Sequence, residues 1–180
     1  SSKNACLKIL SDQAKDFDFP LNIPNNFKKI RPWVNHGWEM VLLAAECVDP
    51  TSHLNILGIE AFSRNYSQES LKALTKWKWT PDALQQALDT SRQESISKDF
   101  NYWLQLHKPF SSVIKRINTL KEEGIEIVIL TTKSISFTKH LLLSFDISEV
   151  QIFGHESGNK PEVLKKLLQK HHIEGFIEDR

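Results

Sequence analysis

The pattern of apolar and polar positions changes near residue 108 of the chain. Up to that point, apolar residues recur at the spacing of amphipathic helices. Beyond it, apolar residues gather into short runs separated by helical patterns, and the runs cover residues 125–130, 150–153 and 175–177. Strands that alternate with helices are typical of a parallel α/β sheet. We therefore expect a helical domain over residues 1–107, followed by an α/β domain over residues 108–180.

Several helix boundaries are marked by their sequence. Thr80 followed by Pro81 is a strong helix start, because threonine caps helices and proline suits the first helical position. From Asp82 the pattern predicts one long helix to about Leu106. Asn159 is expected to cap the helix that follows the second apolar run.

Polar side chains follow the ends of the predicted strands. Thr131 follows the first run, Lys160 opens the helix after the second, and the pair Glu178-Asp179 follows the third. Because right-handed crossovers place the carboxyl ends of parallel strands on one edge of a sheet, we expect these side chains to share a crevice. A hydroxyl and an ammonium group can hold phosphoryl oxygens, and paired carboxylates can hold Mg²⁺. Each residue taken alone also fits an ordinary polar end of a strand or helix.

The order of these residues resembles the second, third and fourth motifs of the haloacid dehalogenase-like (HAD) hydrolases. The resemblance implies an α/β fold with a parallel-sheet, Rossmann-like core. The helical half would be an α-helical cap with the first core-linking helix at its start, and the rest would be part of the core. By the same resemblance, Thr131 binds the transferring phosphoryl group and Lys160 balances charge around the nucleophile. Glu178 and Asp179 would hold Mg²⁺, and Asp179 would thereby take part in catalysis.

The first motif of that family, an Asp-x-Asp after an apolar strand, has no counterpart at a strand end of this chain. Its first aspartate is the nucleophile, so we expect the chain as given to be inactive and its parent protein to carry the motif upstream of Ser1. Asp16-Phe17-Asp18 has the required spacing, but polar residues rather than an apolar strand precede it. We therefore interpret these two aspartates as part of a loop or a helix end.

One segment of the helical half concentrates residues suited to ligand recognition. Its members are Arg31, His36, Trp38 and Glu39. As part of a cap, this segment is expected to bind the part of the substrate that is not cleaved, with Thr132 contacting the substrate from the core. The alternative is that the aromatic residue packs in the core of the cap while the charged residues are solvated.

The resemblance implies a Mg²⁺-dependent phosphatase that acts on a small phosphorylated metabolite through an aspartyl-phosphate intermediate. A phosphomutase, a phosphonatase or a dehalogenase can have the same fold, although the paired acids argue against a dehalogenase, which needs no metal. A different class is a non-catalytic relative that keeps the fold as a binding or regulatory module. A response-regulator-like domain is disfavoured by the long helical first half.

Composition narrows the classes of partner and the compartment. The 180 residues carry a formal net charge of +1, so the chain lacks the excess positive charge typical of proteins that bind nucleic acid or an anionic membrane. No apolar run approaches the ~20 residues that a membrane span needs, and no signal-peptide pattern is present. Cys6 and Cys47 fit no metal or redox spacing and are expected to be reduced and buried. These features favour a cytoplasmic protein. The resemblance adds a small phosphorylated metabolite as the expected partner, and we expect a monomer or a homodimer.

Overall fold

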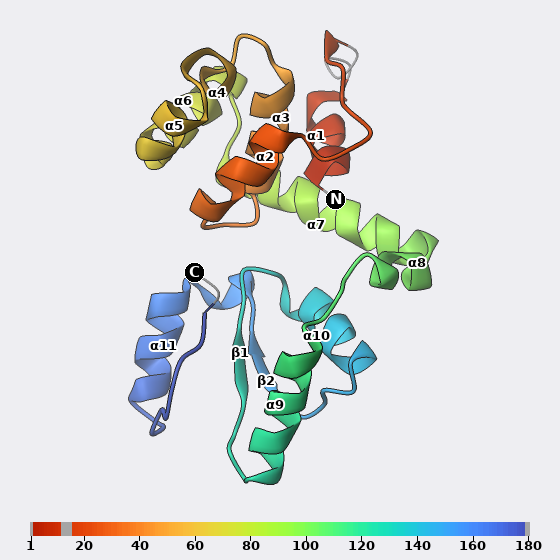
Figure 1. Ribbon diagram of the computed structural model, residues 1–180, viewed down its shortest axis with the longest axis vertical. Coiled ribbons are helices and arrows are strands. Elements are labelled where there is room, and N and C mark those ends of the chain that lie inside the picture. The colour runs from red at the N-terminus through yellow and green to blue at the C-terminus, as the bar shows by residue number, and fades with distance from the viewer. Residues whose placement is uncertain (1, 12–15, 179–180) are drawn as a thin grey trace. The chain divides into compact units, whose positions relative to one another are not determined.

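The computed structural model describes residues 2–11 and 16–178 (Figure 1). The chain divides into two compact units, with the boundary between Lys98 and Asp99. The first unit contains α1 (Ser2–Leu10), α2 (Asn25–Ile30), η2 (Arg31–Trp33), α3 (Glu39–Val48), α4 (His53–Leu57), α5 (Ile59–Arg64), α6 (Tyr66–Trp77) and α7 (Pro81–Lys98). The second contains α8 (Phe100–Gln105), α9 (Ser111–Glu122), β1 (Val128–Leu130), α10 (Ile135–Ser144), β2 (Gln151–Phe153), η3 (His155–Ser157) and α11 (Lys160–Leu168). The division lies closer to the N-terminus than the expected boundary between residues 107 and 108, so α8 belongs to the second unit.

Helix α3 links the two hydrophobic cores of the first unit. Leu42 lies in a core that α3 shares with α1, α6 and α7. Leu43, the next residue, lies in a second core with Ile30, Leu54 and Phe62, which come from α2, α4 and α5. Consecutive helical residues point about 100° apart, so an uninterrupted apolar stretch in α3 supplies both cores.

The turn between α3 and α4 is closed by side chains at the start of α4. The Asn55 amide Nδ2 donates to the carbonyl oxygens of Glu46 at 3.1 Å and Asp49 at 2.8 Å. Ser52 Oγ donates to the same Glu46 carbonyl at 2.7 Å and accepts from the Asn55 N–H at 3.1 Å. These bonds satisfy carbonyl groups that a helix end leaves without partners inside the helix.

The prediction of a single helix from Asp82 to about Leu106 is wrong, because the helix is interrupted at Asp99, between α7 and α8. Asp99 has an extended backbone, with φ −159°, and its carboxylate accepts a hydrogen bond of 2.8 Å from the Tyr102 N–H. An aspartate that caps a new helix competes with continuation of the old one. The predicted start of this region is confirmed, since Thr80 Oγ1 accepts from the Ala83 N–H at 3.2 Å.

The second unit contains a parallel pair of strands joined by a helical crossover. Val128 of β1 is aligned with Gln151 of β2, and Leu130 is aligned with Phe153. α10 connects the two strands, as the alternation of apolar runs and helical patterns predicted for this part of the chain. Both strands therefore end at the same edge of the pair (Figure 1).

The predicted fold class, a parallel-sheet, HAD-like (Rossmann-like) core with an α-helical cap, is wrong. Over the described residues the fold is mostly helical, and its sheet has two strands. The expected third strand at residues 175–177 does not form, and its apolar side chains are exposed, Phe176 at 50% and Ile177 at 91%. A run of three residues is too short to persist as a strand unless a neighbouring strand pairs with it, and no described strand does so.

Two further properties bear on the expected environment of the protein. Among the described helices, none combines the length and the apolar character that crossing a membrane requires. Cys6 and Cys47 are free thiols, Cys6 buried and Cys47 half-buried. Burial raises the pKa of both thiols to about 12, so both are protonated at neutral pH.

Candidate functional site

Thr131 lies directly after β1, at the edge where both strands end. Its N–H donates to the carbonyl oxygen of Phe153 at 2.9 Å, which extends the pairing of the strands by one residue. Its hydroxyl oxygen accepts from the Lys133 N–H at 3.1 Å, which holds the Thr131 side chain against the loop that follows. Thr132, a predicted substrate-binding residue, is half-buried in the same loop. Thr131 can therefore offer its hydroxyl hydrogen to a ligand at this edge.

Lys160 and Glu178, predicted on separate elements of one site, lie together. Lys160 is the first residue of α11, and the Asn159 side chain caps this helix by accepting from the Glu162 N–H at 2.9 Å, as predicted. Lys160 Nζ lies 2.5 Å from Glu178 Oε2, and both side chains are about one-third exposed. The pair brings the chain beyond α11 back to the N-terminal end of that helix (Figure 1).

The remaining predicted residue of this site is Asp179, which lies outside the described residues. Its predicted catalytic and metal-binding roles therefore stay predictions. Within residues 2–11 and 16–178, the structure contains no group of three or more histidine, cysteine, aspartate or glutamate side chains able to hold a metal ion. Glu178 is described, although the strand expected to precede it does not form, and its carboxylate offers the hard oxygen ligands that Mg²⁺ prefers.

The predicted substrate-binding residues of the helical half lie in one short segment, where His36, Trp38 and Glu39 have structural contacts. The Glu39 carboxylate is buried and accepts from the backbone N–H groups of Asn35 at 2.5 Å and His36 at 2.8 Å. Trp38 is half-buried, packs against the core that contains Leu42, and stacks on His36 with ring centroids 6.1 Å apart. Arg31 is exposed on η2. Glu39 and Trp38 thus hold the loop before α3 in place.

Asp16 and Asp18, the aspartates with Asp-x-Asp spacing, are exposed and lie outside any strand. Phe17 between them packs against Trp77, with ring centroids 5.6 Å apart. The segment is therefore anchored by its aromatic residue, and its carboxylates are left to solvent.

The sequence patterns missed a set of polar contacts that ties α6 to the turn between α3 and α4. The Trp77 indole N–H donates to the buried Glu46 carboxylate at 2.8 Å. Lys76 pairs with Asp49. Glu69 contacts His53 Nδ1 at 2.6 Å. These acids were difficult to find because each lies in a helical pattern or turn where a solvated carboxylate is the usual interpretation.

Burial and hydrogen bonding shift the pKa values of these acids in opposite directions. Burial raises the pKa of Glu46, and the Trp77 hydrogen bond only partly offsets it. Burial alone would raise the pKa of Asp49 too, but hydrogen bonds from Lys76 and Thr51 outweigh it and lower the pKa. The hydrogen bond from Lys72 is the largest cause of the lowered pKa of Glu69.

Replacing Glu46 with glutamine is expected to increase the free energy of unfolding of the first unit at neutral pH. A buried carboxyl group with a raised pKa contributes most to stability below its ordinary value of 4.5, and this contribution is lost as the pH rises toward the folded-state pKa. Glutamine does not titrate, and its amide oxygen can still accept the Trp77 indole N–H.

Urea unfolding of Glu46→Gln at several pH values, followed by tryptophan fluorescence, checks this expectation. The increase in the free energy of unfolding of Glu46→Gln over wild type should be present at neutral pH. It should disappear below pH 4.5, the ordinary pKa of a glutamate side chain. Glu60→Gln, at an exposed position of α5, is the matched control and should change little. A Glu46→Gln protein that is less stable than wild type at neutral pH would contradict the assignment.

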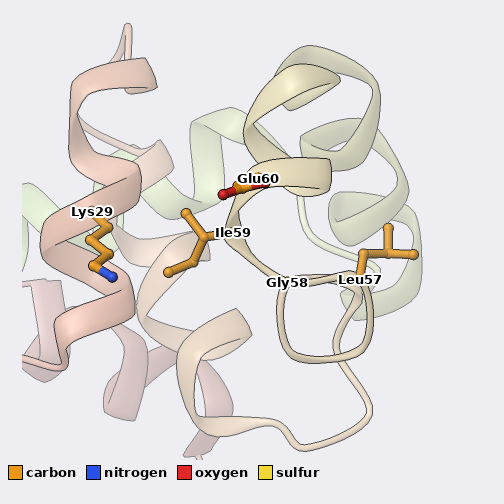
Figure 2. Close-up of a pocket in the computed structure, with 5 residues that line it drawn as sticks. All are labelled: Lys29, Leu57, Gly58, Ile59 and Glu60. Atoms are coloured by element: carbon orange, nitrogen blue, oxygen red, sulfur yellow. The ribbon is translucent and has the colours of Figure 1, made fainter.

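A pocket of about 460 Å³ opens in the first unit beside α2 and the turn between α4 and α5 (Figure 2). Lys29, Leu57, Gly58, Ile59 and Glu60 line it. Ile59 extends toward Lys29, whereas Leu57 points away from both. None of the residues predicted to bind substrate lines this pocket.

Comparison with known proteins adds no relative to this description. No family model matches the chain, and no match is found among the curated proteins or the solved structures.

Proposed function

We propose that the second unit binds phosphoryl groups at the edge where β1 and β2 end, and that the protein is a Mg²⁺-dependent phosphatase of the HAD type. The pairing of Lys160 with Glu178 is the observation that carries this proposal. It joins residues 18 positions apart, and both come from the motifs that the resemblance assigns to phosphoryl transfer. The proposal concerns the chemistry of these residues. It does not include the predicted HAD-like fold class, because the structure contradicts that class.

Thr131 and Lys160 have complementary roles in the proposed site. The Thr131 hydroxyl donates to one phosphoryl oxygen, while the Lys160 ammonium group offsets the negative charge of the others. Glu178 orients Lys160 in the absence of a ligand, because a carboxylate 2.5 Å from Nζ restricts the movement of a long side chain. An arriving phosphate competes with Glu178 for the same ammonium group.

Mg²⁺ fits the donor chemistry of the proposed site. Glu178 would hold the ion, with Asp179 as a second carboxylate as predicted from the sequence, and water and phosphoryl oxygens would complete the set of oxygen ligands. When bound, the ion offsets charge that develops on the phosphoryl group. The substrate class proposed is a small phosphorylated metabolite.

Substituting alanine for Lys160 is expected to weaken binding of inorganic phosphate about tenfold or more. A hydrogen bond to a charged group contributes about 1.5–3 kcal/mol, and 1.4 kcal/mol corresponds to a factor of ten. Isothermal titration of the whole chain with phosphate, in the presence of Mg²⁺, measures the change. Lys165→Ala is the matched control, because Lys165 is an exposed lysine of the same helix.

Three outcomes of these measurements are informative. Equal loss of affinity in Lys160→Ala and Lys165→Ala would mean that general positive charge, not the proposed site, attracts phosphate. Phosphate binding without hydrolysis of phosphomonoesters by the full-length protein would favour the non-catalytic binding module over the phosphatase. Absence of phosphate binding in the wild-type protein would remove the proposal.

A further inference from the structure

The loops that follow β1 and β2 are locked together at the proposed phosphoryl-binding edge. The His155 N–H donates to the carbonyl oxygen of Lys133 at 3.1 Å. The Ile135 N–H lies 3.2 Å from each oxygen of the Glu156 carboxylate, which accepts its hydrogen. Both contacts therefore connect the loop containing Thr131 to the loop after β2.

Gly154 is the residue that allows these loops to approach so closely. A Cβ atom built at Gly154 would lie 2.6 Å from the backbone nitrogen of Ile135 and 2.7 Å from the carbonyl oxygen of Lys133. It would also lie 2.3 Å from a carboxylate oxygen of Glu156. Backbone atoms cannot yield as a flexible side chain can, so any larger residue at this position would push the two loops apart.

We propose that Glu156 is a positioning residue for the phosphoryl-binding loop, defined as residues 131–134. The inference rests on the proposed function of Thr131. By accepting the Ile135 N–H, Glu156 fixes the first residue of α10 directly beyond this loop. Thr131 is fixed at the other end of the loop by its bond to Phe153. With both ends fixed, the hydroxyl of Thr131 keeps one direction.

The acceptor oxygen of Glu156, and not its charge, does this positioning. A neutral amide of the same length can accept the same N–H, so Glu156→Gln should preserve the loop. Glu156→Ala removes this acceptor, whereas the bond from the His155 N–H to the Lys133 carbonyl does not depend on the Glu156 side chain. The alternative role of a carboxylate at this place is to repel a bound anion, and the experiment below distinguishes the two roles.

Amide NMR spectra of the whole chain, recorded with and without inorganic phosphate, test the proposal. Glu156→Gln should keep the amide shifts of residues 131–135 and the phosphate affinity of the wild-type protein. Glu156→Ala should shift or broaden these amide signals and weaken phosphate binding about three- to tenfold, as expected for one lost hydrogen bond. Glu122→Ala, at an exposed position of α9, is the control and should change neither.

Two results would overturn the positioning role. Unchanged amide shifts of Thr131 and Ile135 in Glu156→Ala would show that the carboxylate does not hold the loop. Tighter phosphate binding by Glu156→Ala would show that Glu156 competes with the anion instead of preparing its site. Because the amide shifts are read without phosphate, they test Glu156 even if the wild-type protein binds no phosphate, which would instead count against the proposed function.

Discussion

Phe62→Ala is expected to lower the free energy of unfolding of the first unit by about 3–5 kcal/mol. Phe62 is 1% exposed and lies in the core shared by α2, α3, α4 and α5. Its ring packs edge to face on Tyr66, with centroids 6.1 Å apart. Its removal loses the favourable free energy of burying a large apolar side chain. It also leaves a cavity, because the neighbouring side chains cannot move far enough to fill the space.

Chemical unfolding followed by tryptophan fluorescence measures this loss. The first unit contains Trp33, Trp38, Trp77 and Trp79, four of the five tryptophans in the chain, so the signal reports mainly on this unit. Leu71→Ala is the control, because Leu71 lies on α6 with 65% of its surface exposed. Similar losses in both variants would contradict the assignment of Phe62 to the core.

Asp49→Ala is expected to lower the free energy of unfolding of the first unit by about 2–3 kcal/mol at neutral pH. The carboxylate is buried and accepts from the Thr51 N–H and the Thr51 hydroxyl, each at 2.8 Å, and it pairs with Lys76. Alanine leaves these donors without their acceptor, and it also separates α6 from the turn after α3.

The effect of Asp49→Ala should depend on pH. The pKa of Asp49 is lowered in the folded state, so its contribution to stability is complete above the ordinary value of 3.8 and is lost as the pH falls through the folded-state pKa. Unfolding curves of wild type and variant should therefore converge in strong acid. Asp18→Ala, at an exposed position, should change stability little at any pH. If the difference in free energy of unfolding between Asp49→Ala and wild type were constant from neutral pH to strong acid, an ionised pair of Asp49 with Lys76 would be excluded.

Local features of the fold were predictable from the sequence. Thr80 caps its helix as predicted, because a capping hydroxyl acts on a backbone N–H three residues away. The strands Val128–Leu130 and Gln151–Phe153 lie within predicted apolar runs, and they pair in parallel because a helix connects them.

Features that depend on distant partners were not predictable in the same way. The run at 175–177 has strand-like composition, but composition does not reveal whether a neighbouring strand is present. The break at Asp99 was missed because an aspartate fits both an exposed helical position and a helix cap. The predicted fold class, inferred from the alternation of strands and helices and from the resemblance to the HAD motifs, was wrong because the expected third strand has no strand to pair with among the described residues.

The residues of the candidate site likewise include some that were predictable from the sequence and some that were not. Lys160 and Glu178 were expected to meet, and their side chains are in contact. Glu156 was missed because its partner, a backbone N–H, leaves no mark on the sequence of either loop. Gly154 after a strand could have signalled a close approach of two backbones, since glycine in such a place often allows one.

The closure of α3 by Ser52 and Asn55 affects how this part of the chain folds. α4 has five residues, too few for a helix to persist alone in water. The carbonyl oxygens of Glu46 and Asp49, at the C-terminal end of α3, do not receive the Asn55 hydrogen bonds until Asn55 has docked. The two helices therefore gain their order together, as one cooperative step. Since the bonded residues are only six to nine positions apart, little chain entropy is lost in closing the turn, and this step can come early in folding.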